Sequence, residues 1–430
     1  MNPPLSQRRT RDLGPVDPAA IAEGLKDRPG ALVLTSGEAE GRTLLACDPD
    51  RVFVGPMADD RPFAVLADPA WGPGTVGLAA YDAGARPAVG ARGDWPDLML
   101  ARYPAMLQVD VATGHAVAVG RGGDAAAAEA AVQTAASWLK AARPPVRPGP
   151  PADDFVAEAS GATYRDAVAD VVARIGAGEL FQANLARAWR GTLRPGATPF
   201  DVFARLAGRA SAYGAVWRLG DRAVVSNSPE LFLTLDRGTG RVETRPIKGT
   251  RPRRADPAED AAEAEALLAS AKDRAENLMI VDLMRNDLAR ACRPGSVRAE
   301  RLFDLERHPT VHHLVSTVTG QLAPGADAAA LMAAAFPPGS ITGAPKHQAM
   351  KVIADHEAPR GPWCGSLFLV EEARFTASVL IRTAAFDKDA SPWRWRALAG
   401  AGITADSDPQ AELEETGAKI SALKAALSGP

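Results

Sequence analysis

The sequence predicts a mixed α+β fold. Strand-like and helix-like segments follow one another irregularly along the 430 residues, whereas a parallel α/β fold would alternate them regularly. No repeat of 20–50 residues and no apolar run long enough to cross a bilayer occurs in the sequence. With 46% hydrophobic residues, 23% charged residues and a net charge of -3, the composition is that of a soluble globular chain. The length permits either two or three small domains or one large one.

The first 140 residues mix short apolar runs with Gly, Asp and Pro turns and end in an alanine-rich segment. We expect strands at 31–34 and 51–54, a short apolar run entering a turn at 77–82, and a helix at 125–140. The proline-rich stretch 143–151 follows. It either divides two domains or crosses the surface of one.

The remainder of the chain contains longer helical segments. The spacing of Val168, Val171, Val172 and Ile175 predicts a helix at 163–177. Residues 178–185 lead into an expected strand, and further strands are expected at 223–235 (interrupted at 226–230), 311–320 and 379–383. We expect helices at 257–288, 348–356 and 411–427, and a loop at 336–346. The small residues Gly400, Ala401 and Gly402 predict a tight turn.

A basic stretch, RPIKGTRPR (245–253), places Lys248 among arginines. Its prolines restrict the backbone, and Gly249 lets a ligand approach closely, so we expect a rigid turn. Neighbouring cations lower the pKa of a lysine and can make it a nucleophile. A solvated basic loop is the alternative.

Two predicted helices each carry a pair of acidic residues. Asp273 and Glu276, and likewise Glu412 and Glu415, are three residues apart and therefore share a helix face. Two such pairs could hold one Mg²⁺, which prefers a few carboxylates with waters and substrate oxygens. Two solvated acidic faces are the alternative. Lys419 follows Glu415 by four residues, which by itself predicts a surface ion pair.

Two further positions are candidate site residues. Arg382 falls in an otherwise apolar predicted strand, where a charge should be paired, and arginine suits a carboxylate. His312 and His313 stand at the start of a predicted strand. Because successive side chains point to opposite faces, at most one of them should reach a site.

Several function classes find no support in the sequence. Cys47, Cys292 and Cys364 lack the spacing of a disulfide framework or a zinc site. None lies in a nucleophile elbow, so any glutaminase activity should reside on another chain. The balanced charge does not favour nucleic-acid binding. The N-terminus lacks the apolar region of a signal peptide. We expect a cytoplasmic protein with no nucleic-acid or membrane partner.

Over about 155–430 the chain resembles the chorismate-utilising enzymes. The segments that carry the resemblance run in the family's order: GELFQANL (178–185), SPELF (228–232), PIKGTRP (246–252), DRAENLMIVDL (273–283), RND (285–287), HHLVS (312–316), GSITGAPK (339–346), IRT (381–383), GAG (400–402), and ADSDP (405–409) with Glu415 and Thr416. Residues 1–150 match loosely, through LTSG (34–37) and Tyr81-Asp82. The resemblance implies two large antiparallel sheets packed as a sandwich with helices outside. The N-terminal region 1–150 would contribute to it beside the chorismate-binding region 155–430.

The resemblance also implies roles for particular positions. The catalytic positions would be Lys248 as nucleophile, Glu230 as general acid and base, His313 beside the substrate ring, and Gln182. The Mg²⁺-binding positions would be Glu276 and Glu415, with Asp273 and Glu412 nearby. The chorismate-binding positions would be Arg382, Lys419, Gly400, Ala401 and Gly402, with backbone contacts from Gly249 and Thr250.

Two positions separate the branches of this family. The aminodeoxychorismate synthases resemble this chain in reading PIKGT around Lys248, whereas anthranilate synthases usually read PIAGT. Gln182 stands where isochorismate and salicylate synthases have a lysine that activates water, which favours ammonia as the incoming nucleophile. The resemblance therefore implies amination of chorismate on the route to 4-aminobenzoate and folate. Ammonia would come from a separate glutamine amidotransferase subunit.

Two alternatives stay open. An enzyme that forms anthranilate would use the same substrate, ammonia and Mg²⁺. A chorismate-binding or regulatory homologue without turnover is the other. Its only support is a set of departures from the family's pattern, at Gln348, where arginine is usual, and in 367–375.

Overall fold

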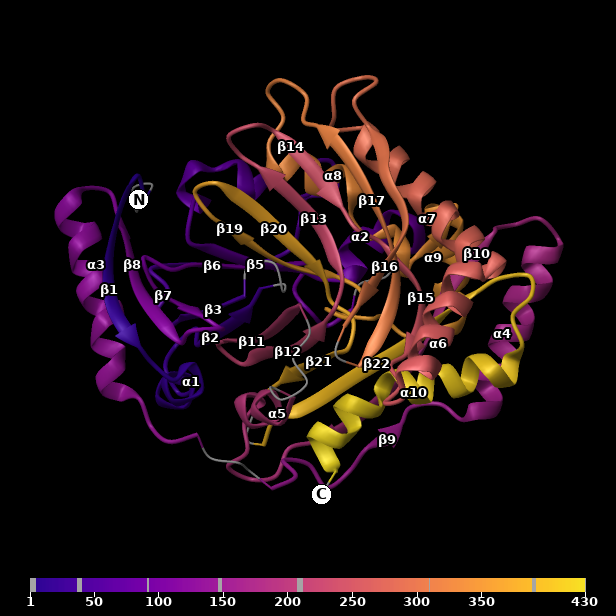
Figure 1. Cartoon of the computed structure of the whole chain (residues 1–430), viewed down its shortest axis with the longest axis horizontal. Coiled ribbons are helices and arrows are strands. Elements are labelled where there is room, and N and C mark those ends of the chain that lie inside the picture. The colour runs from indigo at the N-terminus through magenta and orange to yellow at the C-terminus, as the bar shows by residue number, and fades with distance from the viewer. Residues whose placement is uncertain are drawn as a thin grey trace.

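Two antiparallel sheets form the centre of the molecule, and helices cover the outside (Figure 1). The computed structural model describes residues 5–36, 41–90, 93–145, 149–206, 212–308, 310–388 and 392–429. Gly37 of the LTSG segment and residues 146–148 of the proline-rich stretch lie outside the described residues. The predicted α+β sandwich is confirmed.

The first sheet has 12 strands and the second has 10 among the described residues. The first sheet runs in the order β1 (Gln7–Pro15), β8 (His115–Gly122), β7 (Ala105–Asp110), β3 (Arg42–Ala46), β2 (Leu32–Thr35), β11 (Tyr213–Leu219), β12 (Arg222–Ser228), β21 (Thr383–Asp387), β22 (Arg394–Ile403), β10 (Gln182–Thr192) and β18 (Gly343–Ala344), with β9 (Val156–Ala157) beside β10. The second runs β15 (Ile247–Pro252), β17 (Val311–Gln321), β14 (Arg241–Thr244), β13 (Leu231–Asp236), β20 (Arg374–Val379), β19 (Ser366–Val370), β5 (Thr75–Ala79), β6 (Leu98–Arg102) and β4 (Arg51–Gly55), with β16 (Arg298–Arg307) beside β17.

Strands from the first 122 residues join both sheets. β2 pairs with β11 in the first sheet, and β5 pairs with β19 in the second. The apolar core follows the same arrangement, since one buried cluster contains Val33 and Val216 of the first sheet together with Val76 and Leu369 of the second. The N-terminal strands are therefore built into the sandwich rather than set beside it.

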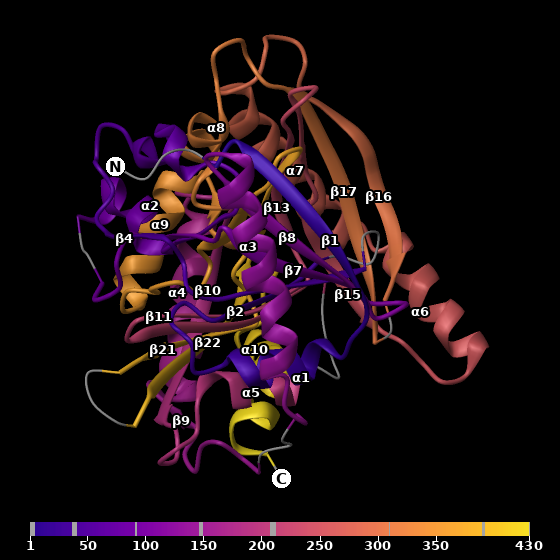
Figure 2. The same ribbon diagram turned by 90° about the vertical axis from the view of Figure 1, so that its left-hand side faces the viewer.

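The helices pack on the outer faces and edges of the sheets. They are α1 (Pro18–Leu25), α2 (Tyr81–Val89), α3 (Ala125–Ser137), α4 (Gly161–Gly176), α5 (Pro199–Leu206), α6 (Pro257–Ala269), α7 (Ala271–Ala289), α8 (Ala328–Ala335), α9 (Lys346–His356) and α10 (Pro409–Ser428). Figure 2 shows α3 alongside β1 and β8, and Figure 1 shows α6, α7 and α10 at the opposite end of the molecule. Within the described residues, no helix combines the length and apolar character needed to span a bilayer.

Four local predictions were wrong or incomplete. The helix expected at 257–288 is two helices, because the Ser270 side chain accepts a hydrogen bond from the Asp273 N–H and so begins α7. The strand expected at 379–383 is interrupted between β20 and β21, where Arg382 has a φ of 51°. Gly400–Gly402 is not a turn but part of β22, paired with β10. The basic stretch is not a turn either, since Lys248 lies on β15.

Candidate functional site

The predicted site residues gather where β15 of the second sheet approaches β10 and β22 of the first. A Cβ atom built on Gly402 would lie 3.0 Å from Gln182 Nε2 and 3.2 Å from Lys248 Nζ. These are closer contacts than Cβ atoms ordinarily make, so the missing side chain at 402 lets the three groups converge. Gln182 is fully buried, and neither its amide oxygen nor its amide nitrogen has a partner among the described residues.

Lys248 is half-buried on β15, beside a bulge at Gly249, whose φ is 90°. Loss of hydration lowers the pKa of Lys248. The Glu276 carboxylate opposes this shift, and the neighbouring Lys419 ammonium adds to it. Among the described residues, no side-chain hydrogen bond holds the Lys248 amine.

The arginines beside Lys248 do not create the shift that the sequence suggested. Arg245 pairs with Glu306, and Arg251 pairs with Asp273 at 3.2 Å. These acids neutralise the two guanidinium groups. The lowered pKa of Lys248 therefore comes from the loss of hydration and from Lys419.

Glu230 lies between β12 and β13 and is only 4% exposed. Burial raises its pKa to about 7, and a hydrogen bond from Ser340, the positive charge of Lys248 and the Ile247 main chain limit the rise. The Ser340 hydroxyl donates to Glu230 Oε1 at 2.6 Å. A carboxyl group that titrates near neutral pH can donate a proton and take it back.

Helices α7 and α10 bring two carboxylates together. Burial raises the pKa of Glu276, and Glu415 is among the charges that add to this rise. Burial would also raise the pKa of Glu415, but Lys419, 2.5 Å away, outweighs it and the pKa falls. The other two predicted acids have different partners: Asp273 pairs with Arg251, and Glu412 accepts a hydrogen bond from Ser407.

The carboxylates of Glu276 and Glu415 fit a magnesium ion better than a metal held only by protein. Among the described residues, no cluster of three or more His, Cys, Asp or Glu side chains could hold a metal. Mg²⁺ needs fewer, because it commonly binds one or two carboxylates and completes its shell with waters and substrate oxygens. The Glu415 carboxylate is close enough to raise the pKa of Glu276. These two carboxylates match the one or two that Mg²⁺ commonly binds.

Arg382 and His313 lie beside each other at this site. Arg382 has no acidic partner within the described ranges, and loss of hydration lowers its pKa. Burial lowers the pKa of His313 to about 3, helped by the charges of Arg382 and His308, so the imidazole is neutral. His313 Nδ1 lies 3.0 Å from Thr250 Oγ1, whereas His312 points the other way, to Asp260. The expectation that the two histidines face opposite ways is confirmed.

The remaining predicted positions are Lys419 and small residues on β15 and β22. Lys419 Nζ donates to the Gly400 carbonyl at 3.0 Å. The Ala401 side chain is buried in an apolar cluster away from Lys248, so only its main chain could meet a ligand. A Cβ on Gly249 would lie 3.1 Å from Asp273 Cβ, so glycine lets β15 pack closely against α7.

The sequence did not single out three contributors. Ser340 and Lys346 lie in the GSITGAPK segment without an assigned role, yet Ser340 contacts Glu230, and Lys346 pairs with the buried Asp287 at 2.6 Å. Asn184 has an unpartnered buried Oδ1 within the described structure, on the same strand face as Gln182. The available signal for Asn184 was its place two residues after Gln182, with apolar residues at 183 and 185.

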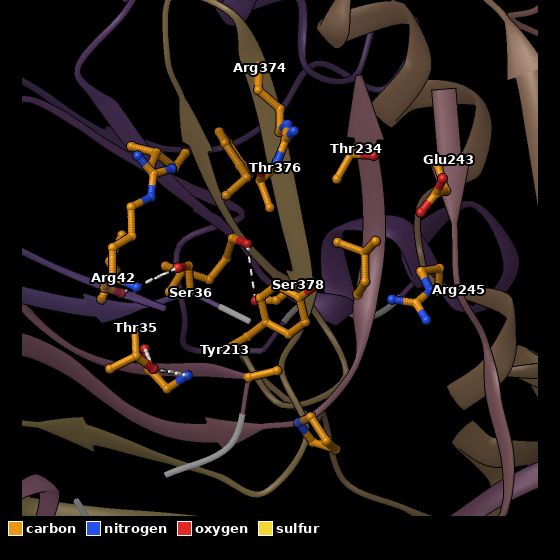
Figure 3. Close-up of a pocket in the computed structure, with 18 of the residues that line it drawn as sticks. Thr35, Ser36, Arg42, Tyr213, Thr234, Glu243, Arg245, Arg374, Thr376 and Ser378 are labelled. Carbon is orange, nitrogen blue, oxygen red and sulfur yellow. Dashed lines mark hydrogen bonds between the residues drawn. The ribbon is translucent and has the colours of Figure 1, made fainter. Parts of the chain in front are cut away.

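A cavity of about 600 Å³ lies elsewhere, between the two sheets (Figure 3). Its lining includes Arg42, Tyr213 and Arg374, and the Arg42 side chain reaches Glu371 across it through two hydrogen bonds. Pro229 and Ile247 border it, but Glu230 and Lys248 do not. The residues expected to react are thus outside this cavity.

A comparison with protein families decides the classification. A family described as chorismate binding enzymes matches residues 53–425. The chain belongs to this family. The match includes every position to which the sequence assigned a role, and it extends back into the N-terminal region at β4 and β5.

Named members of the family cover most of the chain. The chain is 38% identical over 395 residues to aminodeoxychorismate synthase component 1 of Escherichia coli (strain K12), which covers 89% of this chain and 83% of that protein. The Klebsiella aerogenes protein of the same name is 43% identical over 300 residues, 67% of this chain and 63% of its own length, so the match spans less than two thirds of it. The crystal structure of anthranilate synthase component I from Streptococcus pneumoniae TIGR4 superposes with a TM-score of 0.75 at 25% identity, covering 89% of this chain and 92% of that one.

Proposed function

We propose that this chain is the chorismate-aminating component of an aminodeoxychorismate synthase. It would convert chorismate and ammonia to 4-amino-4-deoxychorismate, on the route to 4-aminobenzoate and folate. The observation that carries the proposal is the Lys248 amine, which has a lowered pKa and lies against Gly402 and Gln182. The similarity to two proteins named aminodeoxychorismate synthase component 1 supports it.

Lys248 and Glu230 divide the chemistry. The neutral Lys248 amine attacks C2 of chorismate, the ring double bonds shift, and the C4 hydroxyl leaves as water after taking a proton from Glu230. Ammonia then adds at C4 and expels the lysine. A pKa near 7 lets Glu230 act as an acid in the first half, and the lowered pKa of Lys248 supplies a neutral amine.

The other groups bind and orient the substrate. Arg382 and Lys419 supply positive charge for carboxylates. Gly402 has no side chain to fill the space beside Gln182 and Lys248. Glu276 and Glu415 would hold Mg²⁺, which when bound neutralises a substrate carboxylate. Ammonia would come from a separate glutamine amidotransferase, since Cys47, Cys292 and Cys364 are all buried and free.

Anthranilate synthase is the second candidate, because the superposed Streptococcus pneumoniae structure bears that name. The test is to identify the product formed from chorismate, ammonia and Mg²⁺ by mass spectrometry and fluorescence. Aminodeoxychorismate is the expected product. Fluorescent anthranilate as the main product would overturn the proposal. If the purified chain alone used glutamine, the inference of a separate amidotransferase would be wrong.

A further inference from the structure

Ser340 is a buried hydroxyl that touches a reactive group and has no part in the proposed chemistry so far. We infer that Ser340 is a positioning residue that determines which oxygen of the Glu230 carboxyl carries the transferable proton. This inference rests on the proposed function, since it concerns the proton that Glu230 gives to the leaving hydroxyl.

The geometry of the pair supports this role. Ser340 is 5% exposed and Glu230 is 4% exposed, and the serine Oγ donates to Glu230 Oε1 at 2.6 Å. An oxygen that already accepts this hydrogen bond is the poorer place for a proton. We therefore place the proton of the acid form on Oε2, the oxygen that does not accept the Ser340 hydrogen bond.

The turn that carries Ser340, η5 (Gly339–Ile341), is held firmly against α7. A Cβ on Gly339 would lie 2.6 Å from Leu283 Cδ2, so the glycine lets the turn pack closely against this side chain. Lys346 adds a second tie, because its amine binds Asp287 of α7 and the Pro337 carbonyl at 2.6 and 2.9 Å. The hydroxyl is thus preorganised by the helix that also carries Glu276.

The hydrogen bond from Ser340 to Glu230 becomes stronger as the reaction proceeds. When the Lys248–C2 bond forms and the C4–O bond breaks, the proton on Oε2 moves to the departing hydroxyl and Glu230 becomes a carboxylate. A hydrogen bond to a carboxylate is stronger than one to a neutral acid. Ser340 therefore stabilises the state in which the proton has been transferred more than the state before it, which is the condition for lowering a barrier.

The experiment compares S340A, S340T and a matched serine variant, S296A, whose hydroxyl donates to main-chain carbonyls away from the site. For S340A we expect kcat to fall about tenfold to a hundredfold with little change in KM, as for loss of one hydrogen bond to a charged group. We also expect the descending limb of the pH profile to move to higher pH by about one unit. S340T should restore both values, and S296A should match the wild type.

Two results would overturn the inference. One is a folded S340A protein whose kcat and whose descending limb of the pH–rate profile are the same as in the wild type. The other is a loss of activity in both S340A and S340T with the limb unmoved, which would mean that only packing matters at 340. If S340A does not fold, S340C keeps the volume with a weaker donor and should shift the limb partway; an unmoved limb in S340C would count against Ser340.

The two levels of proposal fail in different ways. Carbon-13 NMR of the Glu230 carboxyl measures its titration without turnover. If the wild type forms anthranilate, or no product, the proposed function fails. A Glu230 pKa that shifts in S340A but not in S340T would in that case still support the positioning role of Ser340. If amination occurs but the titration does not move, only the inference about Ser340 fails.

Discussion

Two lysines in family segments differ in their hydrogen bonds, and this difference separates a structural cation from the amine proposed as the nucleophile. Lys248 on β15 and Lys346 at the start of α9 both have pKa values lowered by burial. Lys346 donates to Asp287 and to the carbonyls of Ala335 and Pro337 at 2.6 to 2.9 Å. Lys248 makes no such hydrogen bond within the described residues and instead lies against Gly402 and Gln182.

This difference shows that a lowered pKa alone does not identify a nucleophile. Three acceptors use all three hydrogens of the Lys346 ammonium and leave no lone pair to attack. Lys248 keeps its lone pair when neutral. Loss of hydration first, and then the charges of Glu276, Lys419 and Glu230, determine how often it is neutral. The following substitutions test that distinction, beginning with the largest expected effect.

Lys248→Ala should reduce amination by on the order of 10³-fold or more, because it removes the nucleophile itself. Folding should be little affected, since no hydrogen bond is lost. Steady-state kinetics with chorismate and ammonia, beside a urea unfolding curve, would measure both quantities. Lys248→Arg keeps the charge without a nucleophilic amine and should be equally inactive. Wild-type kinetics in either variant would remove Lys248 from the mechanism.

Lys346→Met should instead destabilise the fold by about 3–5 kcal/mol, because it leaves the Asp287 carboxylate buried and unpaired. The free energy of unfolding from urea titration is the measurement. Adding Asp287→Leu removes the orphaned charge and should recover much of the loss. A Lys346→Met protein of unchanged stability but no activity would contradict the structural assignment.

Glu276→Gln should raise the Mg²⁺ concentration for half-maximal rate about tenfold or more, as loss of a metal-site group commonly does. It should also move the ascending limb of the pH profile to lower pH, because Glu276 raises the pKa of Lys248 and its removal lets that pKa fall further. Glu414→Gln, on the same helix as Glu415 but hydrogen-bonded to Gln410, is the control. An unaltered Mg²⁺ dependence would argue against Glu276 as a ligand.

The smallest expected effect is the change of rate with pH in the wild-type protein. The rate should rise with pH as Lys248 loses its proton and fall above about pH 7 as Glu230 loses the proton it must donate.

A small amine-reactive acylating reagent should label Lys248 well before Lys346, as peptide mass spectrometry can measure. Equal labelling of the two lysines would remove the contrast between them.

Much of the fold was predictable because local patterns are strong. The helical spacing of Val168, Val171 and Val172 and the alanine-rich segment 125–140 gave helices close to their observed bounds. Predictions failed where the same residue type occurs in two kinds of local structure, as glycine does in turns and in closely packed strands. Gly400 and Gly402 are turn residues by composition, but they lie in a strand because a neighbouring strand and Lys248 need the space that side chains would fill.

The sequence by itself determined the residue types: a lysine in PIKGT, a glutamate in SPELF, and acids three residues apart on two helices. Only the tertiary structure decided which of them meet. It brought Lys248 to Gly402, paired the arginines beside Lys248 with acids, and assigned Ser340 to Glu230. The physical reason is that these contacts join different elements, with sequence separations of 22 residues between Arg251 and Asp273, 61 between Arg245 and Glu306 and 110 between Glu230 and Ser340. Their energies also depend on burial that no local pattern contains.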